Sequence, residues 1–217
     1  MTEKTLVFLK PDAVVRRYVG ARVLDELLDE YDVAHFQVVD PDREFIAGEH
    51  YPQHEGKFFF EWLVDFVDAA PLIVTILRGE DVIDGVRERL GDTIPQEADP
   101  RSLRGRYGTY GGLNVAHASD SPQNAATEID RWRPILEGAA GSASPVARDY
   151  VEQYLNYPTI DPVRYRELTE RVIEGELEPE PARDHFAHLL SKESDAPVAS
   201  ITRLADVMVE NALLDRE

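Results

Sequence analysis

The first 134 residues alternate short apolar runs with amphipathic stretches, and this alternation constrains the fold more than any other feature of the chain. The clearest run is 71–77 (PLIVTIL), whose length and β-branched residues predict a buried strand. The same criteria predict further strands, and apolar residues spaced three and four positions apart predict helices. In chain order, the predicted strands are 5–9, 33–39, 71–77 and 114–116, and the predicted helices are 22–31, 43–51, 58–68, 81–90 and about 120–132.

Without the extra helices at 43–51 and 58–68, these elements follow the order βαββαβ with one late helix. This order favours an α+β fold of the ferredoxin-like kind, an antiparallel sheet with helices packed on one face. Residues 105–112 (GRYGTYGG) hold four glycines and two tyrosines without periodicity, so they predict a loop. Before the late helix, Asp120-Ser121-Pro122 provides a capping residue followed by a proline in the first turn.

The chain changes character at about residue 135. The segment 138–145 is rich in small residues and reads as a linker between a first domain (1–137) and an α-helical C-terminal extension (146–217). The extension is expected to form a small helical subdomain or an arm wrapped on the first domain. Its predicted helices span 146–155, 162–176, 182–192 and 198–213. His185 and His188 have a spacing that can bind metal, but a solvated helix face is the better interpretation.

Charge and composition exclude several classes of protein. The chain has 42 acidic and 23 basic side chains, a formal charge of −19 that disfavours binding to nucleic-acid polymers. It has no cysteine, which excludes disulfides, thiolate nucleophiles and zinc–cysteine sites. The start MTEKTLVFLKPD does not resemble a signal peptide, and no apolar run is long enough for a membrane helix. We therefore expect a cytoplasmic protein with no membrane partner.

The segment 114–121 (NVAHASDS) is the strongest chemical candidate. Its histidine, His117, lies between a predicted strand and a capped helix, where backbone amides and the helix dipole favour a phosphoryl group. Taken alone, such a histidine is more simply a surface or capping residue. Lys10, Arg87 and Arg104 also lie close to turns of small residues, and in a chain this acidic they suggest a local anion site.

Residues 5–134 resemble the nucleoside diphosphate kinase family. The resemblance is carried by TLVFLKPDAVVRR at the start, EHY at 49–51, RERLGDTIPQEADPRSLRGRYG at 87–108 and the histidine motif NVAHASDS. It implies a ping-pong phosphotransferase, in which a nucleoside triphosphate phosphorylates the histidine and a nucleoside diphosphate then accepts the group. The extension resembles no family in the same way.

The resemblance also implies a role for individual residues. His117 matches the nucleophile, Glu128 the carboxylate that orients it, and Ser119 a supporting hydroxyl. The positions that hold the phosphates correspond to Lys10, which is also counted with the catalytic residues, and to Tyr51, Arg87, Thr93 and Arg104. Asn114 matches the residue that binds the sugar hydroxyl and phosphate, and Phe59 the aromatic that stacks on the base. Core packing for Phe59 and a water-facing position for Glu128 are the simpler alternatives.

Magnesium is expected to arrive with the nucleotide phosphates, without a separate metal site in the protein. The family assembles as homohexamers or tetramers built from dimers, so a homo-oligomer is expected. The chain departs from the family pattern at Ala13, Ile94, Arg106, Leu113 and Ala118, and two of these, Arg106 and Leu113, lie in segments that shape subunit contacts. A phosphohistidine enzyme with another acceptor and a silent nucleotide-binding or assembly module remain alternatives.

Overall fold

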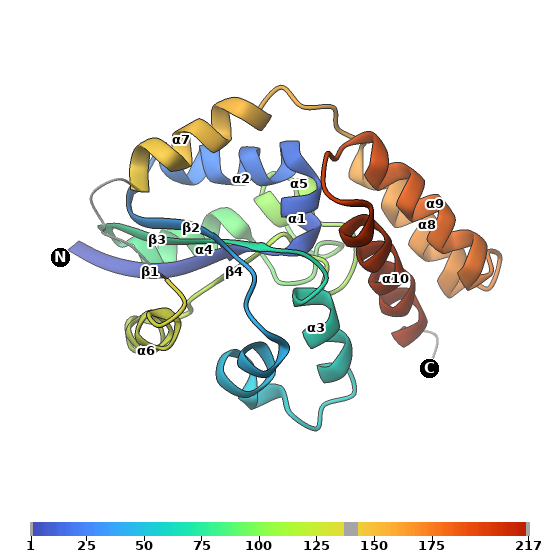
Figure 1. The fold of residues 1–217 in the computed structure, drawn as a ribbon, viewed down its shortest axis with the longest axis horizontal. Helices are drawn as coiled ribbons and strands as arrows, with labels where there is room; N and C mark the ends of the chain where they lie inside the picture. The colour runs from blue at the N-terminus through green and yellow to red at the C-terminus, as the bar shows by residue number, and fades with distance from the viewer. Residues whose placement is uncertain (1, 137–142, 216–217) are drawn as a thin grey trace.

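A computed structural model describes residues 2–136 and 143–215 and contains one four-stranded sheet (Figure 1). The strands are β1 (Thr2–Leu9), β2 (Asp32–Val39), β3 (Leu72–Glu80) and β4 (Ala116–Ala118). Their order across the sheet is β2-β3-β1-β4, and every neighbouring pair is antiparallel. This is the predicted ferredoxin-like arrangement, with the two terminal strands of the βαββαβ pattern side by side.

The helices of the first 136 residues include the five predicted ones, in the predicted order, and three short helices that were not predicted. They are α1 (Pro11–Val15), α2 (Arg17–Leu28), the π-helix η1 (Phe45–His50), the 3₁₀-helix η2 (Pro52–His54), α3 (Phe60–Val67), α4 (Val82–Leu90), α5 (Leu103–Tyr107) and α6 (Pro122–Trp132). The predicted helix 43–51 is thus largely a π-helix. The predicted loop 105–112 begins inside α5, because the Ser102 hydroxyl caps this short helix by accepting the Gly105 N–H at 3.1 Å.

Alternation along the strands gives the sheet two apolar faces. Val7 and Leu9 of β1 pack with α2 and α4, whereas Leu6 and Phe8 join a second cluster that includes residues of α3 and the end of α6. Figure 1 accordingly shows α2 on one side of the sheet and α3 and α6 on the other. The prediction that the helices pack on one face of the sheet is therefore wrong. α2 and α4 cover one face, and Trp132 of α6 and the apolar face of α3 cover the other.

The extension consists of α7 (Ala143–Tyr154), α8 (Pro162–Ile173), α9 (Pro179–Lys192) and α10 (Val198–Leu214). α7 lies as an arm on α2 and β2, whereas α8, α9 and α10 pack on one another beside α3 (Figure 1). The apolar residues of these three helices, among them Tyr165, Phe186 and Met208, belong to the same core cluster as Phe66 of α3. The extension thus shares a hydrophobic core with the sheet. The segment 137–142, most of the predicted linker, lies outside the described residues, and α7 already includes residues 143–145.

A buried ion pair fastens the extension to the start of the chain. The Arg16 Nε donates to a Glu193 carboxylate oxygen at 2.8 Å, and the two side chains are 0% and 1% exposed. The same carboxylate accepts hydrogen bonds from the Tyr165 hydroxyl and, at 2.9 Å, from the Ile160 N–H. The Arg16 guanidinium also lies over the Tyr165 ring, 4.8 Å from its centroid. Because both side chains are buried, removal of either partner would leave an unpaired charge in the core, which makes this contact costly to break.

Two other sequence-based expectations concern the surface and the membrane. His185 and His188 are both exposed on α9, as expected for a solvated helix face. Within residues 2–136 and 143–215, none of the helices combines the length and apolarity needed to span a bilayer.

Candidate active site

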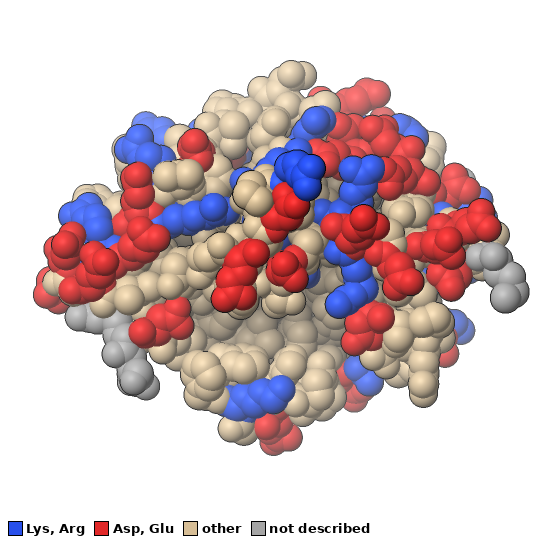
Figure 2. Space-filling model, turned by 180° about the vertical axis from the view of Figure 1, so that it is seen from behind, with Lys and Arg blue, Asp and Glu red and all other residues tan. Residues whose placement is uncertain are grey.

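A cavity of about 850 Å³ opens at the end of the sheet where β4 meets α3, α6 and α10. Figure 2 shows the corresponding side of the molecule, hollowed in its lower half, with mostly uncharged residues in the hollow and acidic side chains above it. Ten residues were predicted to form the site. Nine of them line this cavity: Lys10, Tyr51, Phe59, Arg87, Thr93, Arg104, Asn114, His117 and Glu128. The tenth, Ser119, is fully buried behind the cavity wall.

His117 lies within a strand, not after one as the sequence suggested. The predicted strand 114–116 is displaced to Ala116–Ala118, because Val115 has a left-handed backbone with φ 67° and cannot continue it. The Val115 N–H donates to the Asp12 carboxylate at 3.0 Å, and its carbonyl accepts the Lys10 N–H at 2.9 Å. Such strain costs about 1–3 kcal/mol and persists where surrounding contacts enforce it. Long-range bonds thus set the position at which β4 begins.

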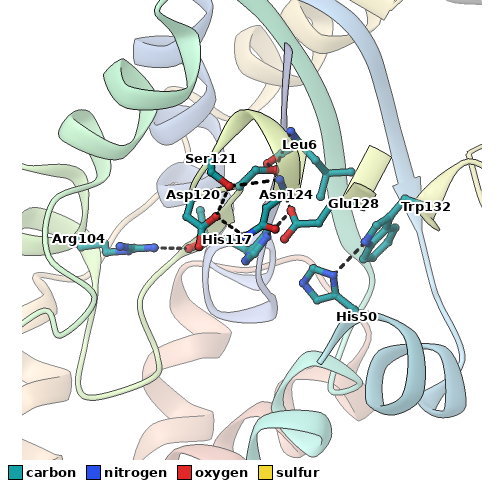
Figure 3. A network of polar contacts seen from close by, with 11 residues as sticks. Leu6, His50, Arg104, His117, Asp120, Ser121, Asn124, Glu128 and Trp132 are labelled. Carbon is teal, nitrogen blue, oxygen red and sulfur yellow. Dashed lines mark hydrogen bonds and ion pairs between the residues drawn. The ribbon is translucent and has the colours of Figure 1, made fainter. Parts of the chain in front are cut away.

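The register of β4 fixes the direction of the His117 ring. His117 pairs with Phe8 of β1, and the two rings stack with their centroids 4.9 Å apart. The ring therefore lies on the face of the sheet covered by α6, where the Glu128 carboxylate is 2.9 Å from Nε2 (Figure 3). The buried Ser119 hydroxyl donates to the same carboxylate oxygen at 2.7 Å. A carboxylate only accepts hydrogen bonds, so Nε2 carries the proton and the Nδ1 lone pair is left to react.

A second histidine, His50, stands against His117. Its ring meets the His117 ring edge to face with centroids 4.6 Å apart, and its Nδ1 accepts the Trp132 indole N–H at 3.1 Å (Figure 3). Burial lowers the pKa of His50 well below its usual value, and the charge of a protonated His117 lowers it further. His50 is therefore neutral, with its hydrogen on Nε2. The sequence predicted a role for the adjacent Tyr51 but not for His50. The position of His50 beside Tyr51 in the motif EHY could have pointed to it.

Lys10 forms the cationic centre of the cavity. Its ammonium group donates to the Asn114 side-chain oxygen at 2.7 Å, and Asn114 Nδ2 in turn donates to the Thr93 carbonyl at 2.9 Å. Burial lowers the pKa of Lys10 to about 7, an effect that the Asp12 carboxylate opposes and the Arg104 charge reinforces. Lys10 is therefore a poorly solvated cation, and an anion that enters the cavity would stabilise its charged form.

Arg104 is held by backbone carbonyls and forms no ion pair with a carboxylate of the described residues. It donates to the carbonyls of Gly91 and Ala116, both at 2.9 Å. Burial and the nearby Arg87 charge lower its pKa to about 10, so it stays protonated at neutral pH. Arg87 and Thr93 are exposed on the cavity wall. Three cations and several hydroxyl or amide groups thus converge near His117, as expected of a phosphate-binding site.

The other part of the cavity is aromatic. In the run 58–60, Phe60 is buried in the core, Phe58 is 79% exposed and Phe59 is half-buried on the cavity wall. Phe60 therefore packs in the core, whereas Phe59 remains available for stacking on a base. Tyr51 is buried, and its pKa is raised by burial and by the Glu128 charge, so its hydroxyl remains protonated.

Two further observations complete the cavity. Asn211, Leu214 and Asp215, at the C-terminal end of α10, also line it, and no signal in the sequence of the extension pointed to this. Across residues 2–136 and 143–215, the structure contains no group of three or more His, Asp or Glu side chains able to hold a metal ion.

Comparisons with known proteins agree on one family. The chain matches the family model "Nucleoside diphosphate kinase" over residues 3–135. A nucleoside diphosphate kinase of Bacillus licheniformis is 41% identical over 132 residues, which span 59% of this chain and 86% of that protein. One from Corynebacterium efficiens is 41% identical over 137 residues, or 63% of this chain and all of that protein. The crystal structure of the Aquifex aeolicus nucleoside diphosphate kinase matches with a TM-score of 0.57 at 37% identity, over 60% of this chain and 94% of that chain. The family match ends before the extension.

Proposed function

This chain belongs to the nucleoside diphosphate kinase family and is an enzyme of that class, and we propose that it works through a phosphohistidine at His117. In this proposal, the terminal phosphate of a nucleoside triphosphate moves to His117 and then to a nucleoside diphosphate. The observation that carries the proposal is the line of contacts from Ser119 through Glu128 to the His117 ring, with the reactive nitrogen left free on the cavity side.

In the first half-reaction, the His117 Nδ1 lone pair attacks the γ-phosphorus. The phosphorus–nitrogen bond forms as the bond to the β–γ bridging oxygen breaks, and the nucleoside diphosphate leaves with that electron pair. The ring gains positive charge, which the Glu128 carboxylate stabilises through Nε2 at 2.9 Å. The second half-reaction reverses these steps with another nucleoside diphosphate. No proton has to leave Nε2 in either direction.

The remaining lining residues supply positioning and charge neutralisation, which account for most of the catalysis in phosphoryl transfer. Lys10, Arg87 and Arg104 would bind phosphate oxygens, and the Thr93 and Tyr51 hydroxyls would donate to them. Asn114, fixed between Lys10 and the Thr93 carbonyl, would bind the sugar hydroxyl and phosphate. Phe59 offers a π-face to the base, and stacking of this kind tolerates any base.

Magnesium fits this arrangement as an ion carried by the nucleotide. The described residues contain no group of three His, Asp or Glu side chains able to hold a metal ion. Asp120 is a lining carboxylate that accepts hydrogen bonds from the Ser121 hydroxyl at 3.0 Å and from Asn124 Nδ2 at 2.6 Å. We propose that phosphate oxygens and water hold the ion, with Asp120 beside it. The chemistry that it supplies is neutralisation of phosphate charge.

We further propose a homo-oligomer built from dimers, a hexamer or tetramer, that works in the cytoplasm. Within the described residues, β2 pairs with β3 on one side and with no strand on the other, so its outer edge could extend the sheet into a second copy beside the α7 arm. The two departures in the segments that shape subunit contacts have partners within this chain: Arg106 donates to Glu26 at 2.6 Å, and Leu113 is buried in the core. Light scattering on the full chain tests the oligomer, and a monomer would contradict it.

Phosphoenzyme labelling tests the proposed chemistry. Purified protein is incubated with magnesium and γ-labelled ATP, and label on the protein is followed before and after addition of ADP or GDP. We expect label that either diphosphate removes, and none on His117→Asn. His188→Asn is the matched control, because this exposed α9 histidine lies outside the cavity.

The other outcomes each contradict the proposal in a defined way. Label that no nucleoside diphosphate removes would indicate another acceptor. Thermal stabilisation by nucleotides without labelling would indicate a silent nucleotide-binding module.

A further inference from the structure

The extension provides one wall of the nucleotide cavity. Asn211, Leu214 and Asp215 line it from the last turn of α10, well beyond the end of the family match at residue 135. The helix that carries them is firmly seated: the Trp62 indole N–H of α3 donates to the Val207 carbonyl of α10 at 2.9 Å. Leu204 and Met208 of the same helix are fully buried. This wall is therefore part of the rigid frame of the site.

Asn211 lies against Gly111, a residue without a side chain in the opposite loop. Gly111 has φ +55°, and a Cβ added to it would lie 3.2 Å from Asn211 Oδ1. Asn211 is only 6% exposed, and its Nδ2 donates to the Tyr110 carbonyl at 3.3 Å. Within the described residues, no donor reaches its Oδ1. The amide is thus fixed by one bond, and its Oδ1 lies beside Gly111, which lines the cavity together with Asn211.

The wall formed by α10 lies next to the aromatic part of the cavity, which indicates the part of a bound nucleotide that it contacts. The phosphate-binding groups gather around His117, where the Arg104 charge is close enough to lower the pKa of Lys10 and Arg104 donates to the Ala116 carbonyl beside His117. The aromatic part is formed by α3, which carries Leu63 and follows directly on Phe59, and α10 packs against α3. A nucleotide with its phosphates at His117 and its base on Phe59 therefore brings the edge of the base toward α10.

The chemistry of the α10 wall selects among bases. Asn211 Oδ1 and the Asp215 carboxylate are both acceptors, and Asp215 also raises the pKa of Tyr110, after burial, by its charge and a hydrogen bond. Guanine presents two adjacent donors on its Watson–Crick edge, N1–H and the N2 amino group. Uracil presents one donor between two carbonyl oxygens, and these oxygens would face the acceptors of Asn211 and Asp215. Buried polar groups left unpaired in this way reduce affinity.

We infer that the end of α10 reads the base edge of the nucleotide and favours guanine over uracil, through Asn211 and Asp215. This inference rests on the proposed function for the pose of the nucleotide. It assigns the extension a role in choosing the substrate, whereas the phosphate and stacking contacts are indifferent to the base.

Binding without turnover tests the inference separately from the kinase activity. Calorimetry on His117→Asn with Mg-GDP and Mg-UDP measures the preference in a protein that cannot form the phosphoenzyme. We expect GDP to bind about tenfold more tightly than UDP, the scale of one good base contact. Adding Asn211→Ala or Asp215→Asn should reduce the ratio severalfold by weakening GDP binding, with little change for UDP.

Two controls keep the test decisive. Glu210→Ala alters an exposed neighbour on the same helix that does not line the cavity, and should leave the ratio unchanged. Asp215 is exposed, so Asp215→Asn tests the wall without disturbing the core if Asn211→Ala fails to fold. Equal binding of GDP and UDP by the parent protein, or an unchanged ratio in a folded wall variant, would overturn the inference. Failure of labelling with this preference intact would refute the phosphohistidine proposal alone.

Discussion

Removal of the Glu193 carboxylate should greatly lower the free energy of unfolding, although Glu193 does not line the cavity. Glu193 accepts from four donors: Arg16 Nε at 2.8 Å, the Ile160 N–H at 2.9 Å, the Thr159 hydroxyl at 3.3 Å and the Tyr165 hydroxyl. In Glu193→Ala, the guanidinium of Arg16 stays buried, with only the Tyr107 carbonyl at 2.8 Å and the Tyr165 ring as partners.

Breaking a buried ion pair by removing one partner costs about 3–5 kcal/mol. We expect Glu193→Ala to lie in this range, because the variant loses the charge pair and three further hydrogen bonds. A loss of about 4 kcal/mol raises the unfolding constant roughly a thousandfold. It would remove a large part of the total stability of an ordinary domain, about 5–15 kcal/mol.

Urea unfolding followed by tryptophan fluorescence is the assay. The two tryptophans report on different regions, since Trp62 contacts α10 and Trp132 lies beside the candidate site. Both should change in a single transition, because the extension and the sheet share a core. Activity measured on the same samples should be lost at the same urea concentration.

Two comparisons isolate the cause. Glu167→Ala removes an exposed carboxylate from α8 and should cost less than about 0.5 kcal/mol. Replacing both partners, as Arg16→Met with Glu193→Leu, should recover the part of the loss that comes from the unpaired charge, whereas the donors of Tyr165, Ile160 and Thr159 still lose their acceptor. A Glu193→Ala protein within about 1 kcal/mol of the parent would refute the reasoning, since it would mean that the buried guanidinium needs no counter-charge.

Three further outcomes follow from the cavity. Lys10→Met should lower phosphotransfer strongly yet be more stable than the parent below pH 7. This advantage should shrink as pH rises from about 7 toward 10.5, because the lowered pKa makes the parent gain stability over that interval; denaturation at several pH values measures it. Nucleotide binding should take up protons near pH 7–8, because the phosphates raise the pKa of Lys10 and it becomes protonated. Calorimetry in buffers of different ionisation enthalpy measures this uptake, and no proton uptake would mean that the pKa of Lys10 is normal. Ser119→Ala should reduce kcat about tenfold without changing KM, because Ser119 holds Glu128 and does not line the cavity; an unchanged kcat in steady-state assays would remove its role.

Much of the fold could be predicted from the sequence, because strand alternation and helix periodicity are local properties. The predicted strand at 114–116 was displaced for a reason that is not local. Val115 adopts its left-handed conformation through a bond to Asp12, 103 residues away in the chain. No window around Val115 contains that information.

The candidate site was predictable to a similar extent. Motif matching identified residues that the structure brings to one cavity, including His117 and Glu128, which lie 11 positions apart and in contact. It could not identify the contribution of α10. Amphipathic spacing predicts that this helix buries one face, but not which surface it packs on or that Asn211 ends beside Gly111. Docking of one element on another depends on tertiary packing, which periodicity does not encode.

The contact between Asn211 and Gly111 also decides how easily the extension could be moved to another protein. A side chain at position 111 would need both a strained backbone and space that Asn211 occupies. The last helix of the extension and the loop around Gly111 therefore have to suit each other, and the extension is not a detachable module. We expect a chimera that carries this extension on another catalytic domain to need compensating changes on both sides of the junction.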